Sequence, residues 1–426
     1  MKHDEKHAKQ GDVVISAGNR NFHLLFTAAE MAKRGRLSLL FCGGYPTRLE
    51  KKLLGNSRLP GARKLSRLLN RQEEIPDGLI RQHRPSEIVS TAGISVRRFS
   101  KSRSLDTALQ TMSFRMYGRH AARYLPKAAE NGAHIYHYRA GFGQSSVKVA
   151  AEAGMRTICD HSIVHPSLLD LLVANGGKFP DERPSRPEGL WGTILDDIEK
   201  ADLVLVNSDF VAKTFSFMGF DRSRLAVVYQ GVEDKFLARL PDERSYYQVG
   251  SSQPVRFLFA GGIGPRKGLD EIAAALAAIP FANIELHLAG SLPQSSRDIY
   301  TKLLADPRVT YHGVLSQDDL AMLMHQSDVF LFPSRAEGSA RVVFEAMAAG
   351  CAVITTENAG SVVRHGEGGL LVPVSDYEAL AGAIEVLLDD AALIADMGLY
   401  NRSVIHNAYT QSHYGDNLEK LYNLSN

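Results

Sequence analysis

The 426-residue sequence has only three cysteines and one tryptophan. Cys42, Cys159 and Cys351 are far apart, and their spacing fits no cysteine-ligated metal motif. Each lies in or beside an apolar run typical of a strand, so we expect buried and reduced thiols. These features exclude a disulfide-rich secreted scaffold and indicate a reducing compartment.

Long apolar segments are also missing. No run approaches the roughly 20 residues of a membrane-spanning helix, and residues 1–6 contain no apolar core of a signal peptide. No internal repeat and no low-complexity tract is visible. The composition, with 44% hydrophobic and 23% charged residues, is typical of globular domains, and the length allows two or three of them. We therefore expect a soluble, cytoplasmic protein.

Acidic residues are scarce in one segment, although the net charge of the whole chain is only +2. Residues 46–130 contain 18 Lys and Arg against 7 Asp and Glu, a local balance of +11 (18 − 7). Such a segment can contact anionic lipid headgroups or acidic glycans, and an ordinary solvated helical face is an equally good interpretation. Because no aromatic-rich RNA motif is interleaved, we expect no nucleic-acid partner, and peripheral contact with the inner face of the cell membrane is a hypothesis.

Short apolar runs alternate with helical patterns along most of the chain, which predicts α/β architecture. Expected strands of a first domain are 13–16, 37–42, 134–138, 156–159, 201–208 and 225–229, and those of a second are 255–260, 284–290, 309–315, 328–332 and 351–355. The polar residues 241–254 predict an interdomain hinge. Residues 46–130 are expected to be mostly helical. Ligands of such parallel sheets bind at the carboxyl ends of the strands.

Two carboxylates follow the strand expected at 328–332. Glu337 lies in the loop, and Glu345 lies eight positions further, within an apolar helix that ends at Gly350. A charge in such a helix needs hydrogen-bond donors, which the hydroxyls of a bound sugar could supply. Eight residues is slightly more than two helical turns, so both acids can face one side. A pair that merely complements the helix dipole and solvent is about equally consistent with the spacing alone.

Backbone amides at the start of this helix and a second glycine loop predict a phosphate site. The amides of Gly338, Ser339 and Ala340 open the helix, where anions are favoured. A loop from Gly261 to Gly268 follows the strand expected at 255–260 and contains the adjacent cations Arg266 and Lys267. A glycine loop with cations before a helix suits a pyrophosphate. Carboxylates for hydroxyls and amides for phosphate together favour a nucleotide sugar.

The run Glu-Gly-x5-Phe-Glu-Ala-Met-Ala-x-Gly, after Pro-Ser and before a strand, resembles the donor-site signature of the retaining family 4 glycosyltransferases. The resemblance covers about 255–374 most closely, and 156–236 to a lesser degree. It implies the GT-B fold, in which two Rossmann-like α/β domains face each other across a cleft. The implied limits are 11–240 for the acceptor-side domain and 255–405 for the nucleotide-sugar domain, with 406–426 returning as a helix to the first domain.

The resemblance also implies roles for particular residues. Glu337 would accept from hydroxyls of the transferred sugar and Glu345 from the ribose, while Arg266 and Lys267 stabilise the departing diphosphate. Gly262 stands where an arginine is usual, so Arg266 can substitute for it. The resemblance places His161 close to the donor sugar, with Asp160 and His165 as alternatives, and the first loop, containing His23, near the acceptor. The donor site would comprise Gly262, Arg266, Lys267, His312, Gly313, Val314, Glu337, Gly338, Ser339, Ala340 and Glu345.

The implied activity is retaining transfer of a sugar from a nucleotide diphosphate donor to a carbohydrate or lipid-linked acceptor, in bacterial glycan or polysaccharide biosynthesis. No Asp-x-Asp motif lies in a suitable loop, so we expect no metal and no cofactor. The residues leave a UDP-, GDP- or ADP-sugar open as donor. The alternatives are an epimerase or phosphorylase of the same fold and a non-catalytic protein that binds nucleotide sugars.

Overall fold

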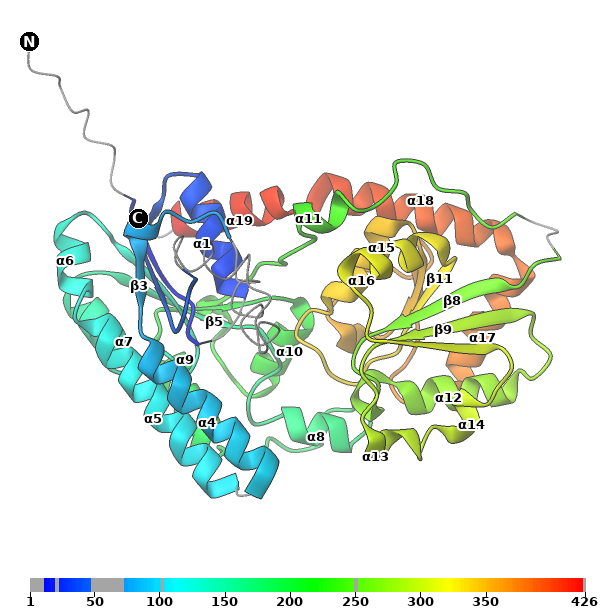
Figure 1. Ribbon diagram of the computed structural model, residues 1–426, viewed down its shortest axis with the longest axis horizontal. Helices are drawn as coiled ribbons and strands as arrows, with labels where there is room; N and C mark the ends of the chain where they lie inside the picture. Colours follow the sequence, from blue (N-terminus) through cyan, green and yellow to red (C-terminus); the bar gives the residue numbers. More distant parts are fainter. Residues whose placement is uncertain (1–10, 20–22, 47–72, 101–102, 249–251, 424–426) are drawn as a thin grey trace, which may run out of the picture.

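The computed structural model describes residues 11–19, 23–46, 73–100, 103–248 and 252–423, with the side chains of 98–100, 103, 294 and 295 outside the description. Two parallel sheets organise the chain (Figure 1). The first has seven strands in the order β3-β2-β1-β4-β5-β6-β7, and the second has six in the order β10-β9-β8-β11-β12-β13. The predicted α/β fold of two Rossmann-like domains is therefore confirmed.

The first domain is built around the seven-stranded sheet, whose central strands are buried apolar runs covered by helices, as parallel sheets require. Its strands are β1 (Val13–Ser16), β2 (Leu37–Cys42), β3 (Ile80–Gln82), β4 (Ile135–Arg139), β5 (Arg156–His161), β6 (Leu203–Val206) and β7 (Leu225–Val227). Its helices are α1 (His23–Lys33), η1 (Asp77–Leu79), α4 (Arg84–Ser100), α5 (Arg103–Ala122), α6 (Leu125–Glu130), α7 (Ser145–Glu152), α8 (Leu169–Ala174), α9 (Gly189–Lys200), α10 (Asp209–Phe217), η2 (Arg222–Arg224) and α11 (Asp234–Leu237).

The second domain is built around the six-stranded sheet and has one continuous apolar core. Its strands are β8 (Val255–Ala260), β9 (Ile284–Ala289), β10 (Val309–Gly313), β11 (Val329–Phe332), β12 (Ala352–Thr355) and β13 (Gly369–Leu371). Its helices are η3 (Pro265–Lys267), α12 (Leu269–Ala278), α13 (Gln294–Arg297), α14 (Thr301–Leu304), α15 (Gln317–Gln326), α16 (Arg341–Ala349), η4 (Glu357–Ala359) and α17 (Tyr377–Asp389). Gly350 ends α16 in the left-handed region, at φ 84°, which confirms the predicted C-cap.

Two C-terminal helices connect the domains. Helix α18 (Ala391–Ala408) packs on α16, and α19 (Gln411–Asn423) packs on α1 of the first domain. Figure 1 shows this red pair running along one edge of the molecule from the second domain to the first. The hydroxyls of Thr27 and Tyr414 are 2.8 Å apart, and Arg34 pairs with Asp416 at 2.9 Å. The C-terminal helix α19 therefore packs against the first domain.

The basic segment 46–130 is less uniformly helical than we expected. It contributes the edge strand β3, which pairs with β2 through Leu40 and Ile80. Three residues, of which only Ile80 is buried, carry too little pattern to predict a strand. The remainder that the structure describes is mainly the α4–α5 pair and α6, and 47–72 lie outside the described residues. No helix in the described ranges is long and apolar enough to cross a membrane.

Candidate functional site

The carboxyl edge of the second sheet gathers four loops. Gly261 follows β8, Gly290 follows β9, Gly313 ends β10, and the loop before α16 follows β11. A Cβ on Gly290 would lie 1.7 Å from the carbonyl oxygen of Gly261, and the amide of Gly290 donates to the carbonyl of Gly313 at 2.7 Å. Glycine is needed here because the backbones are in direct contact.

Glu337 lies between the two predicted cations. Its Oε1 accepts from Arg266 Nη1 at 2.6 Å and from Ser334 Oγ at 3.1 Å, and it also pairs with the ammonium of Lys267. The backbone carbonyl of Arg266 accepts from the amide of Arg335 and the hydroxyl of Ser334, which joins the two loops. The three residues predicted for the diphosphate and the sugar are therefore adjacent before any ligand binds.

Lys267 is held in a confined place at the end of η3. Burial lowers the pKa of its ammonium, and the neighbouring Glu337 opposes that effect. The ammonium lies 5.1 Å from the centre of the Phe332 ring. Gly268 follows at φ 79°, where a Cβ would be 2.1 Å from the carbonyl oxygen of Pro333, so the turn admits only glycine. Lys267 is therefore fixed by backbone contact with the β11 loop.

Glu345 lies apart from this cluster, on α16. Its side chain is only 16% exposed, and its nearest cation is Arg341, with Oε1 and Nη2 3.9 Å apart. Arg341 is engaged by Glu233, which precedes α11. Burial therefore raises the pKa of Glu345, and Arg341 opposes the rise. In the described part of the chain no hydrogen bond reaches the Glu345 carboxylate, and no contact joins it to Glu337. The carboxylate is thus largely shielded from solvent and short of donors.

The start of α16 differs from the expected open amide cradle. The amide of Ala340 donates to the carbonyl of Ala359 at 2.9 Å, so it is already paired within the domain. A Cβ on Gly338 would lie 2.0 Å from the carbonyl oxygen of Ser162, in the first domain. The glycine is thus required for contact between the domains. Among the described residues, the amides of Gly338 and Ser339 have no backbone acceptor.

The other predicted donor-site residues lie at the same edge. Gly262 is exposed, and a Cβ there would meet nothing closer than Ser291 Oγ at 3.9 Å, so this loop leaves open space. His312 is half-buried, and its Nε2 lies 2.9 Å from His287 Nδ1. Val314 is exposed, and Gly313 has φ 70°. The structure therefore brings these residues to the carboxyl edge, without a direct contact to Glu345.

Three polar residues meet at the carboxyl edge of the first sheet. Asp160 Oδ1 lies 2.7 Å from Nε2 of His23, the first residue of α1, and Oδ2 lies 3.5 Å from His137 on β4. Although burial opposes it, the two histidines hold the pKa of Asp160 far below its ordinary range. His161 is buried, its Nε2 lies 3.2 Å from the carbonyl oxygen of Val164, and burial lowers its pKa to about 4. Sequence analysis identified His23 and Asp160 as separate candidate site residues and could not predict that they pair.

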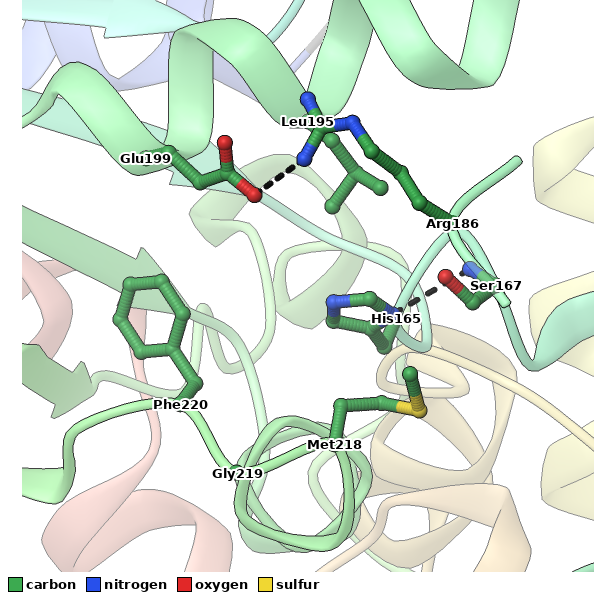
Figure 2. A pocket seen from close by; sticks show the side chains of 8 residues that line it. All are labelled: His165, Ser167, Arg186, Leu195, Glu199, Met218, Gly219 and Phe220. Atoms are coloured by element: carbon green, nitrogen blue, oxygen red, sulfur yellow. Dashed lines mark hydrogen bonds and ion pairs between the residues drawn. The ribbon is translucent and has the colours of Figure 1, made fainter. Parts of the chain in front are cut away.

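His165 lines a separate cavity of about 250 Å³ in the first domain (Figure 2). Burial lowers the pKa of His165 to about 3, and its Nδ1 accepts from the amide of Ser167 at 3.2 Å. Figure 2 shows Arg186 paired with Glu199 across the cavity from Met218. Its complete lining is His165, Ser167, Arg186, Leu195, Glu199, Met218, Gly219 and Phe220. All of these residues belong to the first domain, and none belongs to the Glu337 loop.

Hydrogen bonds between the domains place the two carboxyl edges against each other. The hydroxyl of Ser208 donates to the carbonyl of Gly338, and the amide nitrogen of Asn358 donates to the carbonyl of Gly177 at 2.7 Å. The hydroxyl of Ser375 donates to the carbonyl of Gly176 at 2.7 Å. A cavity of about 290 Å³ also lies between the domains; its lining residues are Asp209, Phe210, Lys213, Tyr229, Thr356, Glu357, Gly360, Ser361, Val363 and Leu371.

Two residues of the site were missed by sequence reasoning. Ser334 donates to Glu337, and Arg341 is the cation nearest to Glu345. Arg341 had a usable signal, because it precedes Glu345 by four positions, the spacing of a helical ion pair. Ser334 belongs to the Pro-Ser pair that precedes the Glu337 run, but its contact with Glu337 could not be predicted, since it depends on the fold of the loop. Among the described residues, no group of three or more His, Cys, Asp or Glu could hold a metal ion.

Comparison with known proteins gives a family match within the second domain. Residues 254–390 match the family described as glycosyl transferases, group 1. The chain is 30% identical over 172 residues to a capsular polysaccharide biosynthesis glycosyltransferase, CapM, of Staphylococcus aureus, covering 39% of this chain and 45% of that protein. It is 27% identical over 234 residues to a lipopolysaccharide core biosynthesis glycosyltransferase, LpsE, of Rhizobium meliloti, covering 52% and 67%. The chain thus spans about half to two thirds of the length of these relatives.

Solved structures match almost the whole chain. A sucrose-phosphate synthase from Thermosynechococcus elongatus has a TM-score of 0.63 and 18% identity, with 97% of this chain and 98% of that chain covered. HepE of Anabaena, in complex with UDP and glucose, has a TM-score of 0.58 and 16% identity, with 96% and 99% covered. Identities this low bear on the fold alone. The chain therefore has the two-domain GT-B fold of these proteins, and its second domain matches the group 1 glycosyl transferases.

Proposed function

We propose that this protein is a glycosyltransferase that moves a sugar from a nucleotide diphosphate donor to a carbohydrate or lipid-linked acceptor. The observation that carries the proposal is the convergence of Arg266 and Lys267 on Glu337, at an edge where glycine loops leave open space beside Gly262. Two cations suit the diphosphate of a nucleotide sugar, and a carboxylate that accepts hydrogen bonds from hydroxyl groups suits its sugar. The names of the relatives, in capsular polysaccharide and lipopolysaccharide core biosynthesis, support a bacterial glycan as product.

In the proposed reaction, two cations stabilise the negative charge of the leaving diphosphate. As the bond between the sugar and the diphosphate breaks, Lys267 and Arg266 stabilise the developing phosphate charge, the task that a metal ion performs in other sites. Glu337 accepts from hydroxyls of the transferred sugar. The acceptor attacks from the face that the phosphate leaves, and a phosphate oxygen takes its proton, so the configuration is retained. We propose that the reaction needs no metal ion.

Glu345 is assigned to the nucleotide. Its carboxylate is largely shielded from solvent and lacks donors in the described structure, and the two hydroxyls of a ribose would supply them. Gly262, His312, Gly313 and Val314 are proposed to lie around the base and the phosphates, together with the free amides of Gly338 and Ser339. On the first domain we propose His161 beside the donor sugar. The pair of His23 and Asp160 would then face the acceptor side.

The test is a thermal-shift screen with UDP, GDP and ADP, followed by a crystal soaked with the nucleotide that stabilises most. HepE was solved with UDP, which makes UDP the first candidate. We expect the diphosphate beside Lys267 and the ribose beside Glu345. A nucleotide found elsewhere, or no stabilisation by any of the three, would contradict the site assignment. Donor consumed without any acceptor would favour an epimerase or phosphorylase, and binding without turnover would favour a non-catalytic binding protein.

A further inference from the structure

Arg341 lies between two carboxylates that come from different parts of the chain. Its Nη2 pairs with Oε1 of Glu233, which precedes α11, and lies 3.9 Å from Oε1 of Glu345, about one turn further along α16. Among the described residues, no other cation forms an ion pair with either carboxylate. One guanidinium is therefore shared unequally, close to Glu233 and more distant from Glu345.

The position of Glu233 is fixed by the segment before it, which lies against the link between α18 and α19. The amide of Val232 donates to the carbonyl of Tyr409 at 2.8 Å. A Cβ on Gly231 would lie 2.2 Å from the same carbonyl oxygen, so the two backbones are in direct contact. Glu233 therefore holds the guanidinium of Arg341 from a rigid point where two connections between the domains meet.

The contact between Arg341 and Glu345 is electrostatic and is not a hydrogen bond. At 3.9 Å the two atoms are too far apart for a hydrogen bond, although the opposite charges still attract each other. Both oxygens of the Glu345 carboxylate therefore keep their acceptor positions, while the positive charge favours the ionised form. Burial raises the pKa of Glu345, and Arg341 opposes the rise. The carboxylate can thus be ionised and still accept from incoming hydroxyls.

Few other charged groups act on Glu345. Glu233 adds a smaller effect that raises its pKa further. The strands under α16, β11 and β12, contain no charged residue. Helices α15 and α18 also pack on α16, and in the described part of the chain neither supplies an ion-pair partner for Glu345. The ionisation of Glu345 therefore depends chiefly on burial and on the position of Arg341.

We propose that Arg341 is a positioning residue for the nucleotide: it keeps the Glu345 carboxylate ionised for the ribose hydroxyls, and Glu233 limits how closely it approaches. This inference rests on the assignment of Glu345 to the ribose under the proposed function. Arg341 itself is assigned no contact with the nucleotide. If Arg341 and Glu233 only tied α16 to the first domain, removing either one would have the same effect. Under the proposal the two removals have opposite effects.

Calorimetric titration with nucleotide at about pH 5 and about pH 8 tests the proposal, because affinity falls as the pH drops through the native pKa of Glu345, above 4.5. The probe is UDP, replaced by GDP or ADP if the thermal-shift screen favours one of these. Arg341→Gln, Arg341→Lys and Glu233→Gln are compared with wild type, each also in a Glu345→Gln background. The matched controls are Lys148→Gln and Glu152→Gln, an exposed pair at the same spacing on α7, 3.7 Å apart.

We expect the loss of affinity between the two pH values to be about three- to tenfold larger in Arg341→Gln than in wild type. In Glu233→Gln it should be about two- to threefold smaller, because the freed guanidinium can approach Glu345. Arg341→Lys and both controls should resemble wild type. In the Glu345→Gln background all variants should show the same loss, which also cancels the titration of the nucleotide itself. Melting temperatures check folding, and Arg341→Met replaces Arg341→Gln if that variant does not fold.

The contrary outcomes are distinct from one another. Changes of the same sign in Arg341→Gln and Glu233→Gln would overturn the proposal in favour of an ion pair that only joins the domains. A loss of affinity in Arg341→Gln that persists in the Glu345→Gln background would overturn it in favour of direct contact between Arg341 and the nucleotide. Either result leaves the donor site intact. A wild type that binds none of the three nucleotides would instead contradict the proposed function, and this inference with it.

Discussion

One carboxylate oxygen of Glu337 pairs with Arg266, Lys267 and Ser334, so the proposed donor site is electrostatically assembled before a donor arrives. A cation that is already fixed needs no reorganisation when charge develops on a leaving group. Lys267 is held more tightly than Arg266, because burial and the Gly268 turn restrict it, whereas the Arg266 side chain is 40% exposed. Lys267 should therefore matter more for turnover than for binding.

Replacing Lys267 by alanine is expected to lower kcat about 10²- to 10³-fold with a smaller change in the KM for the donor, because the stabilisation that it supplies increases as the phosphate departs. Lys302→Ala, on the exposed side of α14, is the matched control and should behave as wild type. Initial rates over a range of donor concentrations measure both constants. A large rise in KM at unchanged kcat would mean that Lys267 only binds the donor.

Glu345→Gln should have opposite effects on binding and stability. The variant loses an ionised acceptor for ribose hydroxyls, so nucleotide affinity should fall about 10- to 100-fold. The ligand-free protein should become more stable, by about 2–4 °C in melting temperature, because a largely desolvated carboxylate without donors is removed. Calorimetric titration with the nucleotide and thermal unfolding of the free protein measure the two effects.

The pH dependence of this effect follows from the raised pKa of Glu345. Above the ordinary value of 4.5, the unfolded chain loses the proton while the native carboxyl still binds it, so the wild type becomes less stable as pH rises through the native pKa. The difference in melting temperature between Glu345→Gln and the wild type should thus be larger at about pH 8 than at about pH 5. An equal difference at both pH values would contradict a raised pKa.

At the scale of elements, the loop from β11 to α16 has two functions. It carries Glu337 toward the cations, and its Gly338 contacts Ser162 and Ser208 of the first domain. The same loop therefore connects the proposed donor site to the contact between the domains. Closing or opening of the domains would move Glu337 and its partners as one unit.

Gly338→Ala should destabilise the protein by about 1–3 kcal/mol, since the new Cβ would lie 2.0 Å from the Ser162 carbonyl oxygen and neither backbone can easily give way. Gly382→Ala is the matched control. Gly382 lies inside α17 with nothing within 4 Å of the added Cβ, so that change should stabilise by about 0.5–1 kcal/mol. Urea unfolding measures both variants, and shifts of the same sign would refute the steric argument.

At the scale of the whole molecule, α18 and α19 hold the two domains to one another. Tyr422 on α19 lies fully buried against the first sheet, with its hydroxyl 2.7 Å from His137 Nδ1. His137 in turn lies 3.5 Å from Asp160 at the carboxyl edge. Helix α19 is thereby connected to the His23–Asp160 pair of the first domain.

Tyr422→Phe should cost about 1–3 kcal/mol, because it leaves the buried His137 nitrogen without its partner and fills no new space. Tyr377→Phe removes a hydroxyl from a side chain that is 42% exposed and should change stability by less than about 0.5 kcal/mol. Thermal unfolding, together with limited proteolysis of α19, measures the effect. If the two variants melt alike, the bond to His137 contributes nothing to docking of the helix.

Much of the fold was predictable because buried parallel strands leave continuous apolar runs such as 328–332 and 351–355, and because Gly350 marks the end of a helix. The expected edge residues, Glu337 and Lys267 among them, followed from their position after such strands. The strand β3 was not predictable, since three residues carry too little pattern. The pairing of His23 with Asp160, 137 positions apart, also could not be predicted from the sequence.

The sequence by itself determined which residues come to the carboxyl edges of the two sheets. Each apolar strand and the turn that follows it are patterns of neighbouring residues, so the residues just after a strand can be identified locally. Only the tertiary structure decided which of them meet. Arg266 and Lys267 share Glu337, and Gly338 serves a contact between domains. Among the described residues, the only ion-pair partner of Glu345 is Arg341, at 3.9 Å. The physical reason is that hydrogen bonds and burial depend on packing between segments far apart in the chain, and no local pattern specifies those distances.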